Sequence, residues 1–505
     1  MMNAERGWSL TIHHAALVIS LLVTACAPSS RSTPVAASLT FPVPDATLAP
    51  QGPPPTPVCD GILPAPPHYE IDLRLDYAAH IAQVTEAIQL VNDSSDAWRD
   101  ISLVVSANHV SGVFDLHALT VDGYPASYVL EGVALRILLP VRLEPGCRLA
   151  LGANYTLNLP RLNAAVVGWR GALGWTTRQS LLGLWYPTLA PYQDGAGWLA
   201  HAPAIQGEYA TTEASHVALK LTLTGEAVDL TLVGSAPGEA CGAAEAQIQE
   251  SAAPAICFEL QGGRHFALAF SDQMDTATAK ARDVAFTSMY FPEHSAAGMA
   301  VLNTTRDAFA AFTDRFGPVP YTSISAVEAD LVDGMEFSGI FFLGRPYFGE
   351  FDGSPQNHLT ALAAHETAHQ WWYSLVGNDP AAEPWLDEAL ATYSEEIYYE
   401  AYYPHLVEWW WGFRVWQYLP DGAVDSDIYV WPDFRSYVDA VYLNGAQFLH
   451  TLRGEIGDEA FFEFLRAYAA TGAGKIVTAE DFWRVYDTQG GDAASSTARI
   501  SYFSP

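Results

Sequence analysis

Apolar and polar residues alternate along much of the chain between residue 68 and about residue 265. The apolar series begins with Tyr69, Ile71, Leu73 and Leu75 and continues with Val84, Ile88 and Leu90. A period of two is typical of half-buried β-strands. Two further series, Val217 to Leu223 and Val228 to Leu232, flank Gly225 and predict a strand pair. Since no convincing helix interrupts this region, we predict one all-β domain of the sandwich or saddle type over residues 68–272.

Beyond Asp272 the apolar spacing becomes helical. Helices are expected at 297–315, 357–376, 385–401, 441–454 and 458–470, with a strand-like stretch from Ile324 to Leu343. No pattern is clear from Gly490 to Pro505. The whole sequence therefore predicts an α+β multidomain chain, in which a mainly helical domain over residues 273–505 follows the β domain.

The first 67 residues show neither the two-residue period of strands nor the apolar spacing of helices. The apolar run from Ala15 to Ala25 has 11 residues, fewer than the roughly 20 that span a membrane. It ends in Val23-Thr24-Ala25-Cys26, which resembles a bacterial lipobox. We therefore expect a signal peptide over 1–25, lipidation of Cys26 and an exported lipoprotein held at the cell surface or in the cell envelope. An ordinary secretory signal is the alternative. Residues 26–67, which contain 12 of the 32 prolines, predict an extended stalk.

Composition limits the partners and the cysteine chemistry. With 57 acidic and 24 basic residues, the net charge is −33, which argues against a nucleic-acid partner. If Cys26 is lipidated, four of the five cysteines remain. Export permits disulfides, and the short loop between Cys241 and Cys257 favours that pair, which leaves Cys59 with Cys147. Buried free thiols are the alternative.

The segment His365-Glu366-Thr367-Ala368-His369 carries the candidate chemistry. Two histidines four residues apart share one face of a helix and can bind one Zn²⁺. Glu366 is rotated by about 100° from His365 and occupies the position of a general base. The apolar flanks of the segment indicate a buried helix rather than two solvated histidines.

A third ligand is expected from Glu388, nineteen residues after His369. Glu388 lies in the apolar run Trp385-Leu386-Asp387-Glu388-Ala389-Leu390-Ala391, which follows Pro384 and is predicted to be a buried helix. A solvated helix face is the usual environment of glutamate. In a buried helix, however, a carboxylate needs a cation.

His-Glu-x-x-His, followed after eighteen residues by Glu, resembles the gluzincin zinc aminopeptidase family, which includes aminopeptidase N and leukotriene hydrolase. Asp333-Gly334-Met335-Glu336 resembles the Gly-x-Met-Glu-Asn motif of that family, and Tyr442 to Gly445 resembles its Tyr-x-x-Gly segment. Trp185-Tyr186-Pro187 and the segment from Arg264 to Leu268 resemble parts of its β domain. The resemblance covers about residues 68–490 and implies a thermolysin-like catalytic domain.

The resemblance implies a role for each matching residue. His365, His369 and Glu388 would bind one Zn²⁺, and Glu366 would activate a zinc-bound water and then protonate the leaving amine. Tyr442 would donate a hydrogen bond to the oxyanion, with Tyr437 as the alternative donor.

Substrate binding follows from the same resemblance. Glu336 would bind the free α-ammonium of a peptide, and the backbone of Gly334 and Met335 would pair with it as an added strand. The second amine-binding residue of the family is not obvious here. Gln179 is a candidate, and an ordinary strand or loop residue is the alternative.

Two further departures from the family concern the surroundings of the site. Phe337 replaces the asparagine of the family motif, so we expect a more apolar pocket wall. Only 117 residues follow Glu388, so we expect a more open site that accepts longer peptides.

Taken together, these patterns predict a monomeric zinc aminopeptidase acting on peptides with free N-termini. A zinc endopeptidase of the same fold and a non-catalytic peptide-binding module are the alternatives.

Overall fold

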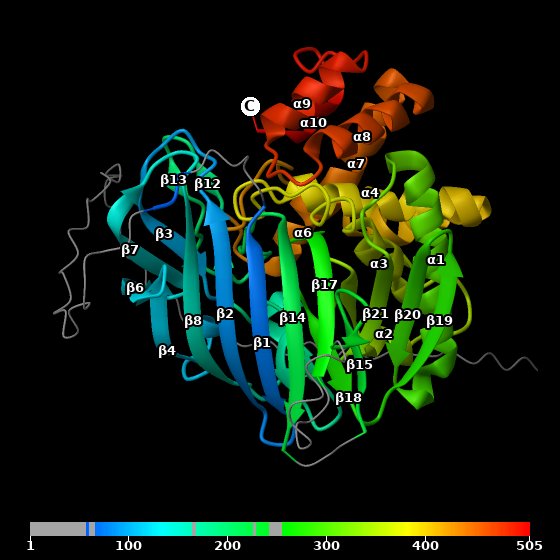
Figure 1. The fold of residues 1–505 in the computed structure, drawn as a ribbon. Helices are drawn as coiled ribbons and strands as arrows, with labels where there is room; N and C mark the ends of the chain where they lie inside the picture. The colour runs from blue at the N-terminus through cyan, green and yellow to red at the C-terminus, as the bar shows by residue number, and fades with distance from the viewer. Residues whose placement is uncertain (1–56, 60–65, 164–167, 226–228, 242–254, 505) are drawn as a thin grey trace, which may run out of the picture. The chain divides into compact units, whose positions relative to one another are not determined.

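The computed structural model describes residues 57–59, 66–163, 168–225, 229–241 and 255–504 (Figure 1). The predicted signal peptide, Cys26 and most of the proline-rich segment lie outside these residues. Among the helices that the structure describes, none is both long enough and apolar enough to cross a bilayer.

The N-terminal region is built on an eight-stranded sheet (Figure 1). Its strands, in spatial order, are β16 (Glu239–Ala240), β17 (Ala255–Gly263), β14 (Ser215–Thr224), β1 (His68–Asp76), β2 (Ile81–Val91), β8 (Arg148–Asn158), β4 (Phe114–Val121) and β5 (Tyr124–Pro125). Only β1 and β14 pair in parallel; the other neighbours are antiparallel. Tyr69, Ile71, Leu73 and Leu75 are all buried, so the alternation correctly identified the inner face of β1.

Two four-stranded sheets complete most of this region. One has the order β15 (Thr231–Gly234), β18 (Leu268–Ser271), β10 (Ser180–Leu182) and β9 (Leu173–Trp175). The other has the order β11 (Thr188–Leu189), β3 (Trp98–Val104), β7 (Ala134–Leu143) and β6 (Ser127–Glu131). The predicted strand pair around Gly225 is wrong, because β14 pairs with β1 and β17 whereas β15 pairs with β18. Alternation specifies the buried face of a strand but not its neighbour.

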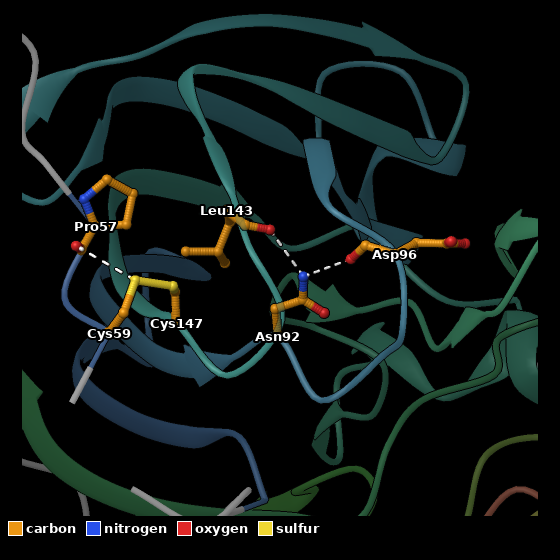
Figure 2. Close-up of a disulfide and its surroundings, with 6 residues drawn as sticks. All are labelled: Pro57, Cys59, Asn92, Asp96, Leu143 and Cys147. Carbon is orange, nitrogen blue, oxygen red and sulfur yellow. Dashed lines mark hydrogen bonds between the residues drawn. A yellow bond between two sulfur atoms is a disulfide. The ribbon is translucent and has the colours of Figure 1, made fainter. Parts of the chain in front are cut away.

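Two disulfides lie in the β region. The structure joins Cys241 to Cys257 and Cys59 to Cys147, the pairs expected from the sequence. Figure 2 shows Cys59 and Cys147 near Asn92, whose buried amide donates to the backbone carbonyls of Leu143 (2.8 Å) and Asp96 (2.7 Å). The second disulfide therefore ties the segment that precedes β1 to the turn before β8.

The helical region contains a five-stranded sheet and the helices that cover it. The sheet order is β19 (Asp275–Ala281), β20 (Val284–Tyr290), β21 (Ser323–Ala329), β23 (Ile340–Gly344) and β22 (Gly334–Phe337), so β22 is an edge strand. Figure 1 shows α1 (Ser295–Phe316) and α3 (His358–Ala368) beside this sheet. The remaining helices of at least six residues are α4 (Trp385–Tyr402), α7 (Asn444–Ile456), α8 (Asp458–Gly472), α9 (Ala479–Thr488) and α10 (Thr497–Tyr502).

One helix prediction needs correction. The helix expected at 357–376 ends at Ala368, and the chain then turns until Tyr373 adopts a φ of 116°, which no helix permits. The apolar residues beyond Ala368, including Trp371 and Trp372, are buried by this turn rather than by a helix. Residues after Gly490, where no pattern was clear, form the short helix α10.

The β and helical regions meet around Arg264, which is almost completely buried. Its guanidinium donates to the backbone carbonyls of Tyr373 (2.6 Å), Thr212 (2.7 Å) and Lys475 (2.8 Å). One charged side chain therefore holds together three segments that are distant in sequence, and one of them directly follows the His-Glu-x-x-His segment.

Candidate metal centre and its cavity

Two helices present the candidate ligands. Asn357 caps α3 by accepting a hydrogen bond from the backbone N–H of Thr360, and His365 and Glu366 follow two turns later. His369 caps the C-terminus of α3 and still bonds back to the carbonyl of His365 (3.3 Å). Glu388 lies in the first turn of α4, which Pro384 precedes.

The three ligand atoms converge on one point. The Nε2 atoms of His365 and His369 are 3.1 Å apart, and the Oε2 atom of Glu388 lies 3.3 Å and 3.6 Å from them. The Nδ1 atom of His365 faces the carboxylate of Glu395 (3.1 Å), and that of His369 faces the carbonyl of Trp372 (2.9 Å).

This arrangement tests whether a metal fits. Because both Nδ1 atoms face acceptors, each must carry the ring proton, which leaves the Nε2 lone pairs directed at each other. The Oε2 atom of Glu388 is buried and accepts no hydrogen bond from the described part of the chain. Three buried electron-pair donors without a proton between them repel one another, so the site fits a cation. Two imidazoles and a carboxylate suit Zn²⁺ in particular.

Glu366 lies beside this centre without belonging to the ligand set. Its carboxylate is 3% exposed and its Oε2 atom has no hydrogen-bond partner among the described residues. Burial raises the pKa of Glu366 to about 8, although His369 and His365 oppose the shift. A Cβ atom at Gly334 would lie 1.9 Å from Oε1 of Glu366, so only glycine lets the edge strand β22 approach so closely.

Glu395, also on α4, orients His365. Its completely buried carboxylate accepts hydrogen bonds from His365, from the indole of Trp410 (2.9 Å) and from Arg414 (3.0 Å). Burial alone would raise the pKa of Glu395, but Arg414 and His365 outweigh it and hold the pKa below its usual range. Glu395 therefore remains ionised and fixes the tautomer of His365.

A cavity of about 330 Å³ opens over the metal centre. One side carries two carboxylates, Glu336 from β22 and Glu208 from the loop that precedes β14. Ligand atoms of Glu336, Glu366 and His369 lie within 4.8 Å of one another, so this acidic side adjoins His369. Burial raises the pKa of Glu336 and of Glu208. Sequence reasoning missed Glu208, because no periodicity or spacing marks it; only the fold brings it to the cavity.

Two tyrosines approach the centre, but only Tyr442 lines the cavity. The ring of Tyr442 stacks on His365 with centroids 6.0 Å apart, and Tyr437 packs edge-on against Tyr442 at 5.6 Å. Tyr437 is fully buried, and its hydroxyl lies where a side chain at Gly207 would be. The geometry therefore favours Tyr442 as the donor that faces a reacting group.

The structure does not bring Gln179 to the cavity. Its amide donates to the carbonyl of Glu328 (3.1 Å) and accepts from the N–H of Asp330 (3.0 Å), so it braces the end of β21. Phe337 does not line the cavity either, because its ring packs against Gly183 of the β region and Phe342. The expected apolar wall from Phe337 is therefore wrong. Met335 lines a smaller cavity of about 20 Å³, together with Glu208 and Glu336.

Comparisons with known proteins agree with this geometry. Residues 302–501 match the peptidase family M1 domain. Aminopeptidase M1-D of Oryza sativa subsp. japonica is 24% identical over 214 residues, which cover 39% of this chain and 23% of that protein. Aminopeptidase N of Streptomyces lividans is 31% identical over 189 residues, which cover 34% of this chain and 22% of that protein. The chain thus spans about a quarter of the length of the curated relatives it matches.

The fold has solved counterparts. An M1 zinc metallopeptidase from Deinococcus radiodurans superposes with a TM-score of 0.61 at 18% identity and covers 86% of this chain and 93% of that one. A point mutant of that enzyme, bound to a Tyr-Ser-Ala substrate, superposes with the same TM-score at 17% identity and covers 86% and 93% of the two chains. Residues 302–501 therefore form a peptidase family M1 domain, and the chain as a whole shares the two-domain fold of M1 zinc metallopeptidases.

Proposed function

We propose that this protein is a zinc-dependent aminopeptidase that removes the first residue from peptides with free amino termini. The observation that carries the proposal is the convergence of His365, His369 and Glu388 beside Glu366, in a cavity that the carboxylates of Glu336 and Glu208 also line. A single zinc ion would be held by His365, His369 and Glu388. When bound there, it would act as a Lewis acid and lower the pKa of water to near neutrality.

The side chains around that ion have separate roles. A zinc ion beside Glu366 would favour its ionised form. In that form Glu366, which is buried and has a free oxygen, accepts the proton of the attacking water and passes it to the leaving amine. The hydroxyl of Tyr442 donates to the oxygen that becomes negative, and losing such a donor elsewhere costs about 10²–10³ in rate. Because β22 is an edge strand of its sheet, the backbone of Gly334 is available for pairing with an extended peptide.

Glu336 and Glu208 make the proposed enzyme an exopeptidase. Both carboxylates lie in a partly desolvated cavity, where a free ammonium stabilises them and an uncharged internal peptide does not. The Tyr-Ser-Ala peptide bound by the Deinococcus radiodurans protein supports a peptide as the ligand of this fold.

One experiment tests both the zinc-dependent mechanism and the requirement for a free amino terminus. Purified protein is given Ala-Ala-Ala and its N-acetylated form, with and without a zinc chelator, and Glu366→Gln is compared with the wild type. We expect cleavage of the free peptide only, loss of activity with chelator, and a decrease in kcat of at least about 10²-fold in Glu366→Gln with its zinc retained. Equal cleavage of the two peptides would favour an endopeptidase, and full turnover by Glu366→Gln would exclude the mechanism.

We also propose that the enzyme works outside the cytoplasm as a lipoprotein anchored through Cys26. The pairing of Cys59 with Cys147 and of Cys241 with Cys257 supports export, because disulfides persist in oxidising compartments. Fractionation of cells that express Cys26→Ser checks this. The variant should leave the membrane fraction, and a variant that stays there contradicts the anchor.

A further inference from the structure

Arg414 is one of the cavity residues whose role the proposed chemistry leaves open. It lies in a π-helical turn, Trp411–Val415, a rare conformation that is frequent at functional sites. Its Nε atom donates to both oxygens of Glu395 (3.2 Å and 3.0 Å) and its Nη2 atom donates to Oε1 (3.1 Å). This two-point contact fixes the plane of the guanidinium.

The third guanidinium nitrogen of Arg414, Nη1, takes no part in this contact with Glu395. In the described part of the chain, no hydrogen bond from its Nη1 atom is found, although the residue lines the cavity and its side chain is only 15% exposed. A donor that is held in a fixed orientation, faces the cavity and has no acceptor among the described residues is well placed to bind a ligand. The ligand that would supply the acceptor enters the same cavity.

The position of Arg414 says which part of a peptide it faces. The amine-binding carboxylate Glu336 adjoins His369, whereas Arg414 is joined through Glu395 to His365. A peptide whose ammonium lies at Glu336 and whose scissile carbonyl lies beside Glu366 must place its second residue further along, toward His365. The cavity wall on that side includes Ala361 and Leu362, one turn before His365 on α3.

We propose that Arg414 binds the main-chain carbonyl oxygen of the second substrate residue, and that the enzyme therefore favours true peptides over aryl amides. This inference rests on the proposed aminopeptidase function. An aryl amide has no main-chain carbonyl on its leaving side, so it offers the Nη1 atom of Arg414 no such acceptor. A hydrogen bond from a charged donor stabilises a complex enough to change affinity about 10- to 100-fold.

The test compares two substrates across matched variants. Ala-Ala-Ala and alanine p-nitroanilide are given to the wild type, to Arg414→Gln and to Arg453→Gln. Arg453 is a suitable control because it is also a nearly buried arginine paired with a glutamate of α4, Glu400 (2.9 Å), but it does not line the cavity. Zinc content is measured for every protein.

We expect Arg414→Gln to lower kcat/KM for the tripeptide about 10- to 100-fold more than for the anilide, mainly through KM, with zinc content retained. Arg453→Gln should leave the ratio of the two substrates at its wild-type value. Equal losses on both substrates, with or without loss of zinc, would show that Arg414 only positions Glu395 and would overturn the proposal. If the wild type cleaves neither substrate, both the proposed function and this inference are wrong. If the wild type cleaves both and Arg414→Gln cleaves each of them as well as the wild type does, only the inference is wrong.

Discussion

Both regions of the molecule bury glutamates, and the pKa values of Glu86 in the β region and Glu395 in the helical region shift in opposite directions. Glu86 on β2 and Glu395 on α4 are 1% and 0% exposed. Glu86 accepts one hydrogen bond, from the hydroxyl of Tyr155 (3.0 Å), and burial raises its pKa to about 8. Glu395 accepts from a histidine, an indole and an arginine, and its pKa stays below the usual range.

The difference shows that burial alone does not decide the charge of a carboxyl group. Desolvation raises the pKa of both carboxyl groups, but a cation in contact with a carboxylate outweighs desolvation and lowers the pKa. The β region can tolerate Glu86 as a neutral acid because nothing there needs a charge. The helical region keeps Glu395 and Glu388 ionised because imidazoles and Arg414 face them. Replacing each glutamate by its neutral isostere tests this contrast.

The largest effect is expected for Glu388→Gln in the helical region. An amide cannot replace the anionic ligand, so zinc affinity should fall by more than the roughly 10- to 100-fold typical of losing a residue that merely orients a ligand. Titration with a competing chelator measures it. Glu396→Gln on the same helix is the control, because Glu396 is equally buried but faces Arg453 (3.6 Å). Unchanged zinc binding in Glu388→Gln would contradict the assigned ligand set.

A smaller loss is expected for Glu395→Gln. The amide keeps the shape of the side chain but removes the charge that fixes His365 and Arg414, so zinc affinity should fall about 10- to 100-fold. The same chelator titration measures this loss. If Glu395→Gln binds zinc as tightly as the wild type, the charge of Glu395 does not matter for zinc binding. The difference in pKa between Glu395 and Glu86 then has no consequence for function.

Glu86→Gln should have the smallest effect of the three substitutions, and it should stabilise the protein rather than weaken a property of it. Because the folded protein holds this proton up to about pH 8 while the unfolded chain releases it near pH 4.5, the contribution of Glu86 to stability is complete below pH 4.5 and is lost as pH rises to 8. Glutamine has no proton to lose, so the variant should melt at a higher Tm than the wild type at pH 8, by about 2–4 °C for each kcal/mol recovered.

Thermal melting at pH 5 and pH 8 checks this expectation. Glu131→Gln, at an exposed position of β6, serves as the control and should show no such gain. A lower Tm for Glu86→Gln at pH 8 would mean that Glu86 is ionised in the folded protein, and the contrast between the two regions would disappear.

Much of the site was accessible from local sequence. The period of an α-helix places His365 and His369 on one face whatever surrounds them, and Pro384 marks the start of the helix that carries Glu388. The buried face of β1 followed from alternation. Strand partners were not accessible, as the wrong pairing around Gly225 shows, because a strand offers the same backbone groups to any neighbour.

The second residue expected to bind the substrate ammonium shows the same limit of local sequence patterns. The β-region sequence offers Gln179 as a candidate, yet this side chain braces β21, and Glu208 lines the cavity instead. Neither residue belongs to a periodic pattern that points at the metal. Which of them reaches it depends on how loops from the β region fold back, and that is decided by contacts between distant segments.

Local sequence patterns predict the type of element along most of the chain, the metal-binding spacing and the position of the candidate general base, since these depend on residues within one or two turns of a helix. Three features of the site come from long-range packing instead: Glu208 joins Glu336, Phe337 turns away, and Glu395 links Arg414 to His365. The two sets differ in the distance along the chain over which the interactions act. Backbone geometry sets the relation between residues four apart, whereas contacts between α4, β22 and the loops are set by the packing of the whole core.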